Sequence, residues 1–169
     1  MNDLFQPAPV ALSNLSLPQL IDTLPREEAK RITTPSPIAS GQSSPLYGHA
    51  ISAGFPSPAD DYVESKLDLN QLLVRNKAAT FFLRVKGDSM TGAGIHDGDI
   101  IVVDRSITPA DRSVVVAVID GELTVKRLLI KQGVAELHAE NPQYAPLRFQ
   151  QDQELTIWGV VTNAVHTVK

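Results

Sequence analysis

The distribution of proline constrains the fold of this chain more than any other feature of its sequence. Seven of the twelve prolines fall within residues 1–53, together with many serines and threonines. Because proline fixes φ and removes a backbone donor, a stretch of this composition rarely packs into a core of its own. Two short pieces, Leu17–Leu24 and Arg26–Ile32, could each form a helical turn or two, but Pro25 separates them. We therefore expect residues 1–53 to be a largely extended or disordered N-terminal arm.

A DNA-reading domain is not expected in this arm. Helix-turn-helix and winged-helix readers need longer uninterrupted helices than these two pieces allow. The net charge of the chain is −4, and its Lys and Arg residues are scattered among acidic residues instead of forming a basic stripe. Any role near DNA is therefore expected to run through a protein partner.

The composition of the chain is typical of a globular protein with one core. Hydrophobic residues make up 43% and charged residues 20% of its 169 residues, which is enough chain for one ordinary domain and an arm. No apolar run approaches the roughly 20 residues of a membrane helix, and no signal-peptide pattern is visible, so we expect a cytoplasmic protein. The chain has no cysteine, which excludes disulfides, thiolate metal sites and a cysteine nucleophile.

The pattern changes after the arm, where strand-like runs dominate. Asp68 is placed to cap a short helix over Asn70–Val74, with leucines on its apolar side. Six strand-like runs follow, at Thr80–Lys86, Asp99–Asp104, Ser113–Ile119, Glu122–Ile130, Val134–His138 and Leu155–Val165. Asp120 and Gly121 separate two of these runs and form a strong hairpin signal. Residues 54–169 are therefore predicted to be a mostly β domain of folded, largely antiparallel sheets.

One serine stands where a strand-like run meets a glycine-rich turn. The segment Gly87–Met90 follows the run Thr80–Lys86 and precedes Gly92–Gly94. Ser89 on such a tight turn can expose its hydroxyl, and neighbouring backbone N–H groups can point at a developing oxyanion. Taken alone, the pattern more often indicates a serine that satisfies local backbone groups in the turn.

Lys126 is the candidate partner of this serine. Strand alternation puts Lys126 on the same face as Leu128 and Ile130, whereas the adjacent Arg127 faces the other way, so one of two neighbouring cations is directed inward. Burial disfavours the charged form of a lysine and can lower its pKa of about 10.4 by up to roughly 3–5 units, which makes a usable base. The alternation by itself favours a second interpretation, a solvated lysine on an edge strand.

The other polar residues give no pattern typical of a metal site or a nucleophile. The four histidines are widely spaced, at His49, His96, His138 and His166. None lies in a metal-ligand or nucleophile-elbow pattern, so surface or hydrogen-bonding roles are expected and no metal site is predicted. The segment Asp97–Asp99 matches no complete calcium loop, and turn chemistry explains it better. Trp158 lies in an apolar run and is expected to anchor a core or an interface.

Several short motifs occur in order between Ala53 and Lys169. They are Ala53–Ala59, Asp61–Glu64, Asp68–Leu73, Gly87–Met90, Gly94–Asp99, Asp120–Lys126 and Trp158–Val161. Their residues, order and intervals resemble the UmuD branch of the LexA-like peptidase family. Such a set is far more specific than any single motif, and it favours the functional interpretation of both Ser89 and Lys126.

The resemblance implies a LexA-like peptidase domain that cuts its own chain with a Ser-Lys dyad and needs no cofactor. Ser89 matches the family's nucleophile and Lys126 its general base. The backbone N–H groups of Ser89 and Met90 would form the oxyanion hole. The bond between Ala53 and Gly54 corresponds to the one that is cut. UmuD proteins often have Cys where this chain has Ala53, and the arm is longer than expected for UmuD.

The resemblance also implies partners. A RecA–single-stranded DNA filament would trigger cleavage in the SOS response. The shortened homodimer would act as accessory subunit of a UmuC-like Y-family translesion polymerase, without direct sequence-specific DNA binding and without a membrane partner. The apolar run Leu155–Val165 would be either a dimer surface or a core strand. Two alternative functions are a LexA-like transcriptional repressor and a non-catalytic polymerase-binding adaptor in which Ser89 and Lys126 are vestigial.

Overall fold

The computed structural model confirms a mostly β fold. It describes residues 11–12, 32–33, 43–47, 63–119, 121–131, 134–146 and 155–168. Contacts divide the chain into two compact units, one of residues 36–75 and the other of residues 1–35 and 76–169. The proposed cleavage residues Ala53 and Gly54 lie outside the described residues, as do both helical pieces expected in the arm, except for Ile32.

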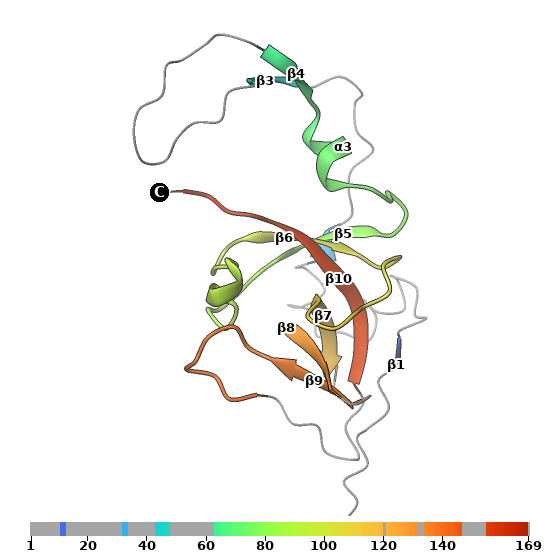
Figure 1. The fold of residues 1–169 in the computed structure, drawn as a ribbon, viewed down its shortest axis with the longest axis vertical. Coiled ribbons are helices and arrows are strands. Elements are labelled where there is room, and N and C mark those ends of the chain that lie inside the picture. Colours follow the sequence, from blue (N-terminus) through green and yellow to red (C-terminus); the bar gives the residue numbers. More distant parts are fainter. Residues whose placement is uncertain are drawn as a thin grey trace, which may run out of the picture. The chain divides into compact units, whose positions relative to one another are not determined.

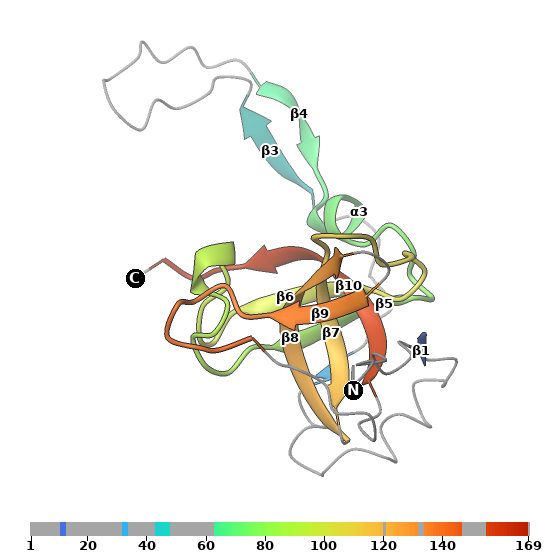
Figure 2. The same cartoon turned by 60° about the horizontal axis from the view of Figure 1, so that its bottom comes forward.

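The larger unit is built on one sheet (Figures 1 and 2). Its strands are β1 (Ala11–Leu12), β2 (Ile32–Thr33), β5 (Thr80–Arg84), β6 (Ile100–Asp104), β7 (Val114–Ile119), β8 (Glu122–Lys131), β9 (Val134–His138) and β10 (Leu155–Val165). Their order is β2-β5-β6-β10-β7-β8-β9, and β1 pairs with β10. The pairing of β1 with β10 is parallel, and the pairings along the main order are antiparallel.

The six strands expected from the sequence are all present, with small differences at their ends. The run predicted over Thr80–Lys86 stops at Arg84, and the run predicted from Asp99 begins at Ile100. Gly87 has a φ of +95°, so the chain turns away from the strand there. The expected hairpin is confirmed by the pairing of Ile119 with Glu122, and Gly121 has the positive φ of 82° that such a turn requires.

Strand β10 joins the two halves of the sheet. Its first half pairs with β7 and its second half with β6, and both pairings contain a register shift. Such bulges bend a strand and allow it to change partners, which fits the long curve of β10 in Figure 1. Ile157–Val160 are buried, so this part of the strand belongs to the core.

The sheet buries side chains on both of its faces, in two core clusters. In β7, Val116 belongs to one cluster, and Val115 and Ala117 belong to the other, as the period of two requires. Trp158 is 2% exposed in the first cluster, where its ring centroid lies 5.3 Å from that of Phe81. The interpretation of Trp158 as a core anchor is therefore confirmed.

The smaller unit contains a hairpin and a short helix. β3 (Ser44–Tyr47) pairs antiparallel with β4 (Val63–Leu67), and α3 (Leu69–Leu73) follows. Asp68 caps the helix by accepting a hydrogen bond from the Asn70 N–H at 2.9 Å, as predicted, although the helix begins one residue earlier than expected. Its leucines do not form a buried side, because Leu69 and Leu72 are exposed. No helix among the described residues is long and apolar enough to span a membrane.

We predict that Gly159→Ala lowers the free energy of unfolding by about 1–3 kcal/mol, because β10 approaches β6 too closely for a side chain. A Cβ at Gly159 would lie 2.7 Å from Cγ1 of Val103, which is completely buried. Urea unfolding followed by circular dichroism measures the change. Thr156→Ala on the same strand is the control, and equal stability of the two variants would contradict the prediction.

Candidate active site

The turn after β5 positions Ser89. Gly87 bends the chain out of the strand, and Asp97 Oδ1 accepts a hydrogen bond from the Gly87 N–H at 2.6 Å. Met90, 2% exposed, anchors the turn in the first core cluster. Ser89 is half-buried. The residue after the serine is therefore fixed in the core, while the serine itself stays accessible.

The segment after β9 is hydrogen-bonded to residues 88–92, which we call the serine turn. The Glu140 N–H donates to the Ser89 carbonyl at 2.9 Å, and the Gly92 N–H donates to the Glu140 carbonyl at 2.6 Å. Asn141 Nδ2 donates to the Asp88 carbonyl at 3.0 Å, and the Tyr144 hydroxyl bonds to the Asp88 carboxylate. We call residues 140–144 the clamp segment. Its bonds fix both ends of the serine turn.

Lys126 reaches the serine from β8, the strand between β7 and β9. Its Nζ lies 2.9 Å from Ser89 Oγ and 3.1 Å from the Val125 carbonyl oxygen. The residue is 9% exposed, and burial lowers the pKa of its amine. Among the described residues, no carboxylate forms an ion pair with Lys126, so no negative charge offsets this effect. The edge-strand interpretation is wrong, because β8 lies between β7 and β9 (Figure 2).

The neighbouring cation, Arg127, points to the other face, as strand alternation predicts. Its Nε lies 2.7 Å from Glu140 Oε1, and its NH1 donates to the Arg112 carbonyl at 2.8 Å. Both charged side chains of the pair are partly buried. Arg127 therefore holds the clamp segment against β8, while Lys126 enters the space beside Ser89.

Ser89 opens onto a pocket between the end of β5 and the start of β8. The pocket is lined by Leu83–Gly87, Ser89, Met90, Ile101, Val116 and Leu123–Val125. Core side chains form an apolar floor, and the chain after β5 forms one wall. Within the described part of the chain, the N–H groups of Ser89 and Met90 donate no hydrogen bond, which leaves two donors beside the hydroxyl.

The histidines fall into different surroundings. His138 Nε2 lies 2.8 Å from Glu136 Oε2, an ordinary polar contact of the kind expected. The Asp97–Asp99 segment makes the expected turn contacts, since the His96 N–H donates to Asp99 Oδ2 at 2.8 Å. Sequence spacing did not indicate that His166 also lies beside Asp99, with 2.7 Å between Nδ1 and Oδ1. Only the pairing of β6 with β10 brings these residues together. His49 lies outside the described residues.

A serine hydroxyl beside a buried lysine amine and an apolar pocket is the arrangement of a serine peptidase that uses lysine in place of histidine. Comparison with known proteins gives the family. A sequence profile described as Peptidase S24-like matches residues 45–162. The chain therefore belongs to the Peptidase S24-like family.

Relatives of known name agree with this assignment. Protein SamA of Salmonella typhimurium is 47% identical over 127 residues, which cover 75% of this chain and 88% of SamA. Protein MucA of Escherichia coli is 48% identical over 124 residues, covering 73% and 84% of the two chains. The LexA repressor of Vibrio campbellii is 36% identical over 156 residues, covering 91% and 75%. The expected UmuD-type, self-cleaving serine peptidase is confirmed at the level of the family.

We predict that Gly92→Ala slows self-cleavage by on the order of 10²-fold, because small misplacements of a reacting group carry such a cost. A Cβ at this position would lie 2.5 Å from the Glu140 carbonyl oxygen and would push the serine turn away from the clamp segment. The first-order cleavage rate at raised pH is the measurement. Thr91→Ala is the matched control, and equal rates in the two variants would show that the clamp does not position Ser89.

Proposed function

We propose that this chain is an SOS-response serine peptidase in which Ser89 is the nucleophile and Lys126 the general base. The observation that carries the proposal is the 2.9 Å separation of Lys126 Nζ and Ser89 Oγ, at a lysine that is 9% exposed. A neutral amine can accept the hydroxyl proton, whereas an ammonium group has no lone pair with which to accept it. Burial without a carboxylate partner favours the neutral amine.

The proposed reaction cuts the bond between Ala53 and Gly54. Lys126 removes the proton of Ser89, and Oγ attacks the Ala53 carbonyl carbon. The N–H groups of Ser89 and Met90 stabilise the resulting oxyanion. Lys126 then gives its proton to the amine of Gly54, and water hydrolyses the acyl-enzyme ester. The products are residues 1–53 and a peptidase domain of residues 54–169.

The small residues at the proposed bond suit the pocket beside Ser89. Ala53 needs little space, and Gly54 allows the backbone to approach the nucleophile closely. The substrate belongs to the same chain or the same dimer, so its effective concentration is high without an elaborate specificity site. Control of the reaction then falls to conformation, because the enzyme and its substrate are always together.

We assign this control to a RecA–single-stranded DNA filament, which would stabilise the cleavable position of the arm by binding it preferentially. The shortened homodimer would then join a UmuC-like Y-family translesion polymerase. The UmuD-like character of the relatives SamA and MucA supports both partners. The net charge of −4 supports recruitment through proteins in place of direct sequence-specific DNA binding.

We predict that Ser89→Ala and Lys126→Met each abolish self-cleavage, because one removes the nucleophile and the other the base. Lys126→Arg should also be inactive, since a guanidinium group stays protonated at any usable pH. The measurement is mass spectrometry of the protein after incubation with RecA filament. The parent chain should give a large fragment that begins at Gly54.

Lys131→Met provides the matched control, because Lys131 is an exposed lysine on the same strand. This variant should be cut like the parent chain. A fragment beginning at Gly54 in the Ser89→Ala or Lys126→Met variant would rule out the dyad. A large fragment with any other N-terminus would rule out the proposed bond.

We predict that unassisted cleavage becomes faster as the pH rises, because only the neutral form of Lys126 accepts a proton. Burial lowers the pKa of Lys126, so the inflection should lie below the ordinary lysine value of about 10.4. Single-turnover rates measured from about pH 6 to 11 test this expectation. A flat profile, or an inflection near the ordinary histidine value of about 6.5, would show that another group is the base.

A further inference from the structure

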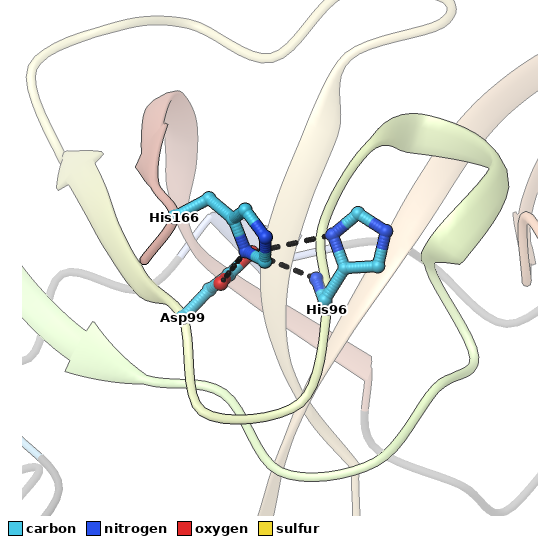
Figure 3. A group of neighbouring side chains, drawn as sticks. All are labelled: His96, Asp99 and His166. Atoms are coloured by element: carbon cyan, nitrogen blue, oxygen red, sulfur yellow. Dashed lines mark hydrogen bonds and ion pairs between the residues drawn. The ribbon is translucent and has the colours of Figure 1, made fainter. Parts of the chain in front are cut away.

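Two histidines and one carboxylate, none of them used by the proposed reaction, lie together on the larger unit (Figure 3). His96 and Asp99 belong to the turn before β6, and His166 follows the end of β10. The pairing of Val165 with Ile100 brings these two segments together. The three residues therefore come from two elements that the sheet itself fixes.

In this cluster a buried carboxylate lies beside two half-exposed imidazoles. The Asp99 side chain is 3% exposed, whereas those of His96 and His166 are 47% and 48% exposed. The imidazole centroids are 4.9 Å apart, with 47° between the ring planes. One donor atom from each of the three residues lies within 4.8 Å of the others. The buried carboxylate thus faces two half-exposed imidazoles.

These separations are close to those of a metal site. His96 Nδ1 lies 3.7 Å from Asp99 Oδ2, and His166 Nδ1 lies 2.7 Å from Asp99 Oδ1. Donors around a tetrahedral zinc ion lie about 3.4 Å apart, as the usual zinc–nitrogen and zinc–oxygen distances require. Side-chain rotations that bring the three donors, which already lie within 4.8 Å of one another, to about 3.4 Å apart would complete the site. Half-exposed histidines can make such rotations without disturbing a core.

We propose that His96, Asp99 and His166 form a binding site for a divalent transition-metal ion of the zinc class. Two imidazoles and one carboxylate are ligands that Zn²⁺ accepts, and imidazole disfavours Mg²⁺ and Ca²⁺ as occupants. Water completes the coordination, since the mouth of the site is open. The ion replaces the hydrogen bond between His166 and Asp99 with bonds from one centre to all three residues.

The charges around the site agree with a cation. Asp99 turns both carboxylate oxygens toward the histidines, since Oδ2 accepts from the His96 N–H at 2.8 Å and Oδ1 lies 2.7 Å from His166 Nδ1. Asp97 adds a second carboxylate in the same turn. The guanidinium of Arg84 lies near the turn, but its NH1 donates to the Gly98 carbonyl at 3.0 Å and is thus directed at the backbone.

Bound metal would join two distant parts of the chain. Asp99 and His166 are 67 residues apart in the sequence, and the ion would tie the end of β10 to the turn before β6. That turn also supports the wall of the pocket, since the Val85 N–H donates to the Asp99 carbonyl at 2.8 Å. The expected effect is a more stable fold, because the unfolded chain cannot hold the three ligands together.

The test is calorimetric titration of the full chain with ZnCl₂, in the Ser89→Ala variant so that self-cleavage cannot intervene. One ion should bind per chain, and the midpoint of thermal unfolding should rise with zinc concentration. His96→Gln and His166→Gln should each weaken zinc binding by at least about tenfold. Mutating a residue that only supports a metal ligand already lowers metal affinity by about 10–100-fold, and these variants remove a ligand itself. Both variants should lose the zinc-dependent rise in midpoint.

His138→Gln is the matched control, because His138 is another partly exposed histidine beside a carboxylate. It should bind zinc like the parent chain. Unfolding midpoints without zinc show whether His96→Gln and His166→Gln are folded, and Asp99→Asn supplies a third variant. Unchanged binding in both histidine variants, an equal loss in His138→Gln, or no saturable one-to-one binding would overturn the site. None of these outcomes bears on the Ser89 and Lys126 assignment.

Discussion

The burial of the Lys126 amine without a carboxylate partner is the constraint on which the rest of this structure depends. A charged ammonium group taken out of water loses its hydration, and only an anion or a loss of its proton can offset the cost. Among the described residues no anion is paired with Lys126, so the fold itself must hold the side chain in place. Strand β8 does this because it lies between β7 and β9 and carries the buried Leu128 two residues further on.

Strand alternation assigns complementary tasks to two neighbouring cations. Lys126 faces the space beside Ser89, whereas Arg127 forms an ion pair with Glu140 on the other face. Glu140 in turn binds the serine turn through its backbone N–H and carbonyl groups. One strand therefore carries the proposed base and, through Arg127 and Glu140, holds the turn of the proposed nucleophile. A shift of its register by one residue would exchange the two side chains and lose both functions.

Local patterns predicted the strands and the hairpin well, because alternation and an Asp-Gly pair act over a few residues. Apart from this hairpin, the sequence did not predict which strands pair, since the other pairings depend on contacts between distant segments. The clamp segment and the cluster of His96, Asp99 and His166 were missed for this reason. Lys126 illustrates the same limit: alternation predicted that Lys126 and Arg127 face opposite ways, but not which of them is buried or that β8 lies between two other strands. Only the family resemblance, which depends on the order of several motifs, predicted that Ser89 and Lys126 act together.

Burial lowers the pKa of Lys126, the proposed base, so this pKa depends on whatever covers the amine. In the proposed mechanism the arm brings Ala53 and Gly54 to Ser89, and we propose that the docked arm also excludes water from the amine of Lys126. Docking therefore lowers the pKa of the base further in the same conformation that presents the bond. An activator that only stabilises the docked arm would therefore both present the bond to Ser89 and lower the pKa of Lys126. It would need to contribute no catalytic group of its own. A carboxylate partner for Lys126 would remove this coupling, because it would hold the amine in its charged form whether or not the arm is docked.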